Sequence, residues 1–136
     1  MRLSAKSLLA AALLCACAFP ALADQRTAEA DPALSTAIAG KWRDSKNVAR
    51  DAYRHPSRTL TFFGVKPDQT VVEITPGAGW YSEILGPYLN AKGHYVAAVA
   101  KPADPNGGGA RSNKALGDKF AADKAHYGNA RIVEFD

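Results

Sequence analysis

The chain has 136 residues, of which 47% are hydrophobic and 22% are charged, and its formal net charge is +4. This composition is that of an ordinary globular protein, and it excludes collagen, coiled coils and long disordered chains. Both cysteines, Cys15 and Cys17, lie near the N-terminus. The rest of the chain is therefore expected to hold neither a disulfide framework nor a cysteine-based zinc site.

The N-terminus has the pattern of a secretory signal peptide. Arg2 and Lys6 precede an apolar run over residues 8–18, and Ala21-Leu22-Ala23 supplies the small residues that signal peptidase reads. We expect cleavage after Ala23, which would make residues 1–23 the signal peptide and place the protein in the periplasm or outside the cell.

The same segment predicts no stable membrane span after cleavage. The uncharged run over residues 7–23 is 17 residues long, shorter than the roughly 20 that cross a bilayer. A lipoprotein modified at Cys17 is the minor alternative.

Cleavage also changes the length and charge of the chain. Removing the 23 leader residues from 136 leaves 113 residues, and loss of Arg2 and Lys6 lowers the net charge from +4 to +2.

The first part of the mature chain is predicted to be helical. Residues 24–31 are expected to form a flexible lead-in, followed by a helical extension over residues 32–64. An acidic N-cap followed by proline, Asp31-Pro32, predicts a helix over residues 32–43 with Leu34, Ile38 and Trp42 on one face. The second helical pattern ends before Pro56, and a short helical turn follows that closes at Gly64.

The remainder of the chain alternates between strands and helices. The predicted order is a strand over 70–74, a glycine loop, a helix from Trp80, a strand over 94–100, a loop over 101–109, a helix over 113–125 and a strand over 131–135. This order predicts an α/β fold, in which residues 32–136 are the N-terminal βαβαβ half of a Rossmann-like, doubly wound parallel sheet with a helical N-terminal extension.

The segment Glu73-Ile74-Thr75-Pro76-Gly77-Ala78-Gly79 contains the residues that indicate chemistry. It places a carboxylate, a glycine loop and the positive end of a helix in one crevice. Glycines at 77 and 79 allow a ligand to approach the main chain closely. A carboxylate there favours a ligand with positive charge or hydroxyl donors and repels a pyrophosphate, so we expect an adenosyl ligand with a cationic amino-acid tail.

This run resembles the first motif of class I S-adenosylmethionine-dependent methyltransferases, and residues 50–85 are similar to a group of predicted secreted or periplasmic bacterial methyltransferases. The resemblance implies S-adenosylmethionine as cofactor and methyl transfer to an unknown acceptor, with catalytic residues unknown. It implies that Glu73, Gly77 and Gly79 line the methionine end of the cofactor, while the other loop residues shape the loop. The candidate cofactor-binding residues are Glu73, Thr75, Pro76, Gly77, Ala78, Gly79, Tyr81 and Asp104.

Two positions depart from the family pattern. Thr75 stands where many methyltransferases have the first glycine, which is tolerable if its backbone angle is ordinary. The second strand ends in Ala100-Lys101 instead of an acidic residue, so Asp104 in the next loop is the candidate partner for the ribose hydroxyls.

Two alternatives remain open. One is a nicotinamide-dinucleotide-binding oxidoreductase fragment, because Gly77 and Gly79 are followed by Ser82 at the third motif position and Lys101 suits a 2′-phosphate. Glu73 argues against this alternative. The other is a non-catalytic secreted binding domain.

Other motifs predict ordinary structural roles. Arg54-His55 is either a solvated helix end, which is the favoured interpretation, or a pair that lies over the mouth of the cofactor site and acts on a substrate. Gly107-Gly108-Gly109 is interpreted as a linker. Trp80 and Tyr81 either stack on a ligand or pack in the core. Isolated histidines predict no metal site, and the lack of a one-sided basic stripe predicts no nucleic-acid partner.

The sequence also predicts an incomplete fold. It stops after the third predicted strand, whereas the resembled family builds its acceptor side from later residues. A half-sheet of three strands leaves an exposed apolar edge and one uncovered face. We therefore expect a C-terminally truncated chain that supplies the cofactor-binding half and is inactive as a fragment.

Overall fold

The computed structural model describes residues 31–136. The predicted signal peptide, its cleavage after Ala23 and the lipid-modified Cys17 lie outside these residues, as does the lead-in up to residue 30. Within residues 31–136, no helix combines the length and apolar character needed to cross a membrane.

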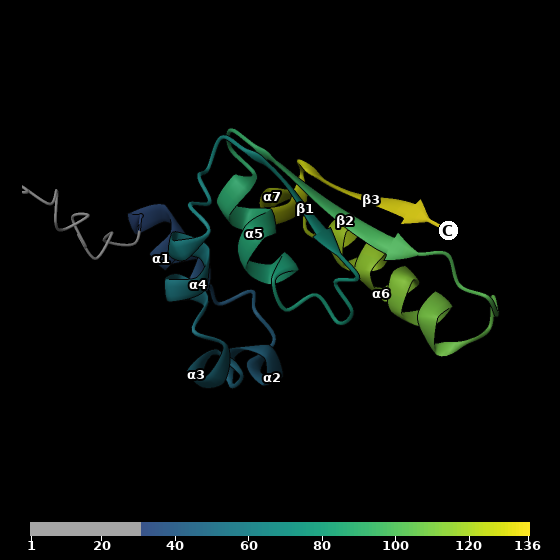
Figure 1. Ribbon diagram of the computed structural model, residues 1–136. Coiled ribbons are helices and arrows are strands. Elements are labelled where there is room, and N and C mark those ends of the chain that lie inside the picture. Colours follow the sequence, from purple (N-terminus) through teal and green to yellow (C-terminus); the bar gives the residue numbers. More distant parts are fainter. Residues whose placement is uncertain (1–30) are drawn as a thin grey trace, which may run out of the picture.

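The described chain is an α/β structure with three parallel strands in one open sheet (Figure 1). The strands are β1 (Thr70–Ile74), β2 (His94–Ala100) and β3 (Ala130–Phe135), with β2 in the centre. Both outer strands run parallel to β2, so their carboxyl ends meet at the same edge of the sheet. In α/β sheets, ligands bind at that edge.

The central strand is apolar because β1 and β3 flank both of its edges and the helices cover one of its faces. All residues from Tyr95 to Val99 are buried, whereas β1 alternates between exposed and half-buried residues. Helices α5 (Ser82–Leu89), α6 (Gly108–Ala122) and α7 (Lys124–Tyr127) supply Ile84, Leu116, Phe120 and Tyr127 to one core with Tyr95, Ala97 and Val99. The helices therefore cover one face of the sheet, and the opposite face carries Val72, Ile74, Val133 and Phe135, all exposed.

The N-terminal extension consists of four short helices. They are α1 (Pro32–Ile38), α2 (Ser45–Val48), α3 (Asp51–Arg54) and α4 (Pro56–Phe62). Asp31 caps α1 as predicted, with its carboxylate 2.8 Å from the amide nitrogen of Ala33.

The prediction of one helix over residues 32–43 is wrong at its C-terminal end. The chain turns at Gly40, where an added Cβ would lie 2.2 Å from the indole of Trp42. Trp42 does not continue the apolar face of α1. Its indole N–H instead donates to the carbonyl of Glu83 at 2.9 Å, a bond across 41 positions of the sequence that helical periodicity does not reveal.

Several boundaries in the βα units also differ from the prediction. Helix α5 begins at Ser82 instead of Trp80, and β3 begins at Ala130, one residue before the predicted start. Helix α6 begins at Gly108, five residues before the predicted start, so Gly108 and Gly109 form its first turn instead of a linker. The predicted helix over 113–125 is divided, because Asp123 ends α6 and caps α7 through the amide of His126 at 3.2 Å.

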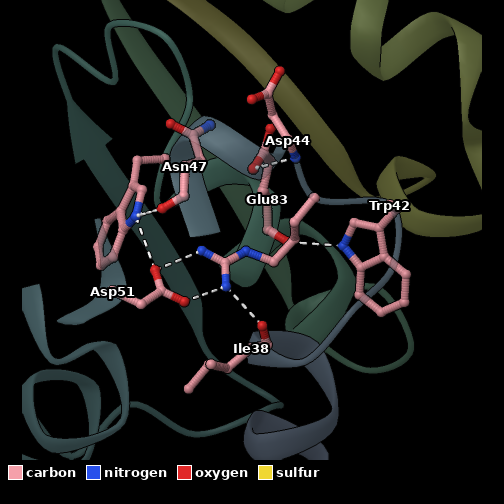
Figure 2. A network of polar contacts seen from close by, with 8 residues as sticks. Ile38, Trp42, Asp44, Asn47, Asp51 and Glu83 are labelled. Atoms are coloured by element: carbon pink, nitrogen blue, oxygen red, sulfur yellow. Dashed lines mark hydrogen bonds and ion pairs between the residues drawn. The ribbon is translucent and has the colours of Figure 1, made fainter. Parts of the chain in front are cut away.

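A buried ion pair fixes the extension to the start of α5 (Figure 2). The guanidinium of Arg43 donates to both carboxylate oxygens of Asp51, at 2.6 and 2.9 Å, and to the carbonyl of Ile38 at 2.6 Å. The indole N–H of Trp80 donates to the same carboxylate at 3.0 Å and to the carbonyl of Asn47 at 2.9 Å. Bidentate pairs of this kind have a defined geometry, so α2 and α3 are held beside the glycine loop that precedes Trp80.

Candidate functional site

The glycine loop leaves the carboxyl end of β1 with three residues in the left-handed region. The φ angles of Thr75, Gly77 and Gly79 are +57°, +56° and +78°. The amide of Thr75 donates to the carbonyl of Ala98 on β2 at 2.8 Å, so the first turn of the loop is anchored to the neighbouring strand.

The two glycines of the loop serve different needs. A Cβ at Gly77 would meet no atom within 4 Å, so this glycine is required by its backbone angle and borders open space. A Cβ at Gly79 would lie 3.1 Å from Leu116 on α6 and 3.2 Å from the hydroxyl of Ser82 on α5. Gly79 therefore also allows the start of α5 and the side of α6 to pack closely.

From the sequence, threonine is expected to replace the first glycine of the motif without strain only if the backbone angle at residue 75 is ordinary. The φ of Thr75 is +57°, so this condition is not met. A β-branched residue in the left-handed region is an outlier, with a cost of about 1–2 kcal/mol. The loop thus adopts at residue 75 a conformation that glycine adopts without strain, although the residue present is threonine.

Glu73 is the last residue but one of β1 and lies on the face that the helices cover. It pairs in register with Ala97, which is fully buried, and its own side chain is half-buried. The hydroxyl of Tyr95 donates to its carboxylate, and the hydroxyl of Ser82 lies 2.8 Å from that of Tyr95. Because Tyr95 uses its proton for Glu73, Ser82 is the donor in the second contact.

Burial dominates the ionisation of this group. Desolvation raises the pKa of Glu73 above its usual value, although the bond from Tyr95 and the nearby charge of Arg54 oppose the shift. Burial, with the carboxylate of Glu73, also raises the pKa of Tyr95. Tyr95 therefore stays protonated and donates its hydrogen bond to Glu73. A cation bound beside the carboxylate of Glu73 would offset the cost of burying its ionised form.

An open cavity of about 260 Å³ lies between the glycine loop and α6. Ser112 lines it and its hydroxyl is 3.3 Å from the carbonyl of Gly77. Lys119 also lines it and forms an ion pair with the fully buried carboxylate of Glu83 on α5. The lining residues are Gly77, Ala78, Ser112, Ala115, Leu116 and Lys119.

The loop side of this cavity is predictable from the sequence motif, whereas its helix side is not. The four α6 residues are spaced at 112, 115, 116 and 119, which places them on one face of a helix. That spacing was the available signal, but it does not indicate that the face turns toward residues 77 and 78.

Arg54 lies at the exposed end of α3, as the interpretation as a solvated helix end predicts, and it also contacts two aromatic rings. Its side chain is exposed, but its guanidinium carbon lies 4.3 Å from the ring centre of Trp80 and 5.6 Å from that of Tyr81. Trp80 is only 3% exposed and packs in the core, while Tyr81 is half-buried beside it at 4.5 Å between ring centres. Arg54 therefore lies beside the two aromatic residues that follow the glycine loop.

Asp104 lies in the loop between β2 and α6 and makes its contacts within that loop. Its carboxylate accepts from the amide of Asn106 at 2.8 Å, and its carbonyl accepts from the amide of Gly107 at 3.0 Å. Neither contact reaches Glu73 or the glycine loop. The structure explains Asp104 as a turn residue, and its proposed contact with a ribose stays a prediction.

Residues 31–136 contain no group of three histidine, cysteine or acidic side chains arranged to hold a metal ion. A comparison of the chain with protein-family models, curated proteins and solved structures finds no match in any of the three.

Proposed function

We propose that this chain binds S-adenosylmethionine at the carboxyl end of β1 and belongs to the cofactor-binding part of a class I methyltransferase. One observation carries the proposal. Three residues of a single loop, Thr75, Gly77 and Gly79, adopt left-handed angles directly after β1, whose last residue but one is the half-buried Glu73. Residue 75 has a backbone angle that glycine adopts without strain, and it is the position at which many methyltransferases have the first glycine of the motif.

The residues present fit the chemistry of that cofactor. Gly77 borders open space where a side chain would otherwise stand, so a ligand has access to the main chain. The carboxylate of Glu73 suits the ammonium group of an amino-acid tail, because a cation offsets the cost of burying the ionised form. When bound, S-adenosylmethionine supplies a methyl group on a positively charged sulfur. The residues of this chain bind and orient it.

The arrangement of the sheet supports a Rossmann-like βαβαβ unit as part of the same proposal. Parallel strands follow one another as β1, β2 and β3, and the connecting helices share one face. The candidate site lies at the carboxyl edge, where such folds bind their ligands. A dinucleotide is the less suitable ligand, since its pyrophosphate would approach the carboxylate of Glu73. The sequence proposes a periplasmic or secreted location, and it does not identify the acceptor of the methyl group.

Calorimetric titration of the full chain tests this function. We expect S-adenosylmethionine and S-adenosylhomocysteine to bind and NADPH not to bind. Binding of NADPH without a response to the other two would reject the methyltransferase proposal in favour of a dinucleotide-binding domain. Absence of binding to all three would favour a non-catalytic domain.

A matched pair of glycine variants localises the binding. Gly77 and Gly64 have φ angles of +56° and +65°, and an added Cβ meets no atom within 4 Å at either position. Gly77→Ala and Gly64→Ala should each lower the free energy of unfolding by about 1 kcal/mol, because alanine disfavours this angle. Only Gly77→Ala should also weaken binding of S-adenosylmethionine, by about tenfold or more. Equal binding by the two variants would contradict a site at the loop.

A further inference from the structure

We propose that Arg54, from the helical extension, recognises the carboxylate of the ligand's amino-acid tail, while Glu73 takes its ammonium group. The inference rests on the proposed function and deepens it, because it assigns a specificity-determining residue outside the glycine loop. The ligand class it predicts is an adenosyl compound with a complete zwitterionic amino-acid end.

The guanidinium of Arg54 is held in place although it is exposed. It stacks over Trp80 at 4.3 Å and lies 5.6 Å from the ring centre of Tyr81, an arrangement that attracts a cation to an aromatic face. Trp80 is itself fixed by its bonds to the carbonyl of Asn47 and the carboxylate of Asp51. The position of Arg54 therefore follows from a chain of well-defined contacts.

The hydrogen-bonding edges of this guanidinium are unused within the part of the chain that the structure describes. Among residues 31–136, the Arg54 side chain has no hydrogen bond and no ion pair, and the only contacts found for its guanidinium are with the two aromatic rings. Stacking occupies one face of the planar group and leaves its N–H donors available. Such a fork matches the two oxygens of a carboxylate.

Glu73 supplies the opposite charge from β1, the strand that leads into the glycine loop. Arg54 is near enough to Glu73 for its charge to act on that carboxyl, yet no ion pair joins them. The carboxylate of Glu73 takes its hydrogen bond from Tyr95. Two opposite charges that are close but unpaired complement a zwitterion, whose ammonium and carboxylate groups are attached to one carbon.

The test compares S-adenosylmethionine with decarboxylated S-adenosylmethionine, which lacks only the carboxylate. Calorimetric titration of the full chain should show that the complete ligand binds about tenfold or more tightly than the decarboxylated one. Arg54→Met removes the charge and retains a side chain that packs on aromatic rings. This variant should bind both ligands equally, at the affinity that the wild-type chain shows for the decarboxylated ligand.

Two further variants make the result specific. Arg54→Lys keeps the charge and loses the planar fork, so it should retain part of the preference for the complete ligand. Arg58→Met, at an exposed arginine on α4, should retain all of it. Circular dichroism and thermal unfolding establish that each variant is folded.

The outcomes separate the two proposals. If the wild-type chain binds neither ligand, the proposed function fails. If the wild-type chain binds both ligands, the proposed function stands. The role assigned to Arg54 is then wrong if Arg54→Met weakens the binding of both ligands by the same factor, or if this variant keeps the wild-type preference for the complete ligand.

Discussion

Thr75 combines a strained backbone angle with a position at the centre of the candidate site. Its φ of +57° is one that glycine adopts freely, and none of the hydrogen bonds of the described residues involves its side chain. The strain of about 1–2 kcal/mol exceeds the conformational entropy of about 0.5–1 kcal/mol that a glycine loses on folding. Thr75→Gly should therefore raise the free energy of unfolding, by up to about 1 kcal/mol.

Thr70→Gly is the matched control, because Thr70 begins the regular strand β1. Glycine weakens a strand by about 0.5–1 kcal/mol, so this variant should be less stable than the wild-type chain. Urea unfolding of both variants measures the difference. A loss of stability in Thr75→Gly as large as that in Thr70→Gly would contradict strain at residue 75.

Glu73 makes the stability of the protein depend on pH in a defined direction. Burial raises its pKa above 4.5 in the folded chain, so the folded state binds a proton more readily than the unfolded state. Its contribution to stability is therefore complete below the unfolded pKa and is lost as the pH rises through the folded pKa. Glutamine does not ionise, and its side-chain oxygen still accepts a hydrogen bond from Tyr95.

Glu73→Gln should consequently increase the free energy of unfolding at pH 7, and the gain should shrink as the pH falls through the raised folded pKa and disappear below the unfolded pKa of about 4. The same variant should bind S-adenosylmethionine more weakly, because it lacks the negative charge. Urea unfolding at several pH values measures the first effect, with Glu134→Gln on the exposed end of β3 as control. A gain that does not change with pH would refute the assignment to ionisation.

At the scale of elements, one ion pair joins α5 to α6 behind the glycine loop. Glu83 is 0% exposed, and its carboxylate pairs with Lys119 and accepts from the amide of Asp44 at 3.2 Å. Lys119→Met leaves this buried carboxylate without its counter-ion. Removing one partner of a buried pair costs about 3–5 kcal/mol, and since the Lys119 side chain is 34% exposed we expect the lower end of that range.

Lys114→Met provides the control on the same helix. Lys114 pairs with Asp118 at 2.6 Å, but both side chains are well exposed, and pairs of this kind contribute about 0.3–0.5 kcal/mol. Thermal and urea unfolding should thus separate the two variants clearly. Equal losses would show that the Glu83 carboxylate does not depend on Lys119.

The elements that could be predicted are those whose bounds are set by neighbouring residues in the sequence. Strands β1 and β2 have the predicted bounds, 70–74 and 94–100, because their apolar and β-branched runs are bounded by turn residues. The start of α6 was missed, since Gly107-Gly108-Gly109 favours a loop by local propensity and forms a helical turn here.

The candidate site likewise combines residues that a local motif predicts with residues that tertiary packing brings together. Glu73 and the loop that follows it are contiguous in sequence, so their chemistry could be predicted from the motif. Arg54 and Lys119 join them through stacking on Trp80 and pairing with Glu83. Those contacts arise from tertiary packing, which no local pattern in the sequence encodes.

At the scale of the whole molecule, the sheet is covered on one face only. On the other face Val72 and Ile74 of β1 are 56% and 71% exposed, and Val133 and Phe135 of β3 are 41% and 40% exposed. The register places Ile74 beside Ala98 of β2 and Ala98 beside Val133. These side chains therefore form one apolar strip across the sheet, with unpaired strand edges beside it, and surfaces of this kind promote association.

We expect the chain to self-associate as its concentration rises, through this strip. The double variant Val72→Thr with Ile74→Thr should reduce the association, because threonine keeps the β propensity of the strand and replaces an apolar group with a hydroxyl. Sedimentation velocity over a series of concentrations measures it. Val48→Thr, at a valine that is 44% exposed on α2 and outside the sheet, is the control and should associate as the wild-type chain does. A wild-type chain that remains monomeric, or a double variant that associates equally, would show that the open face does not govern association.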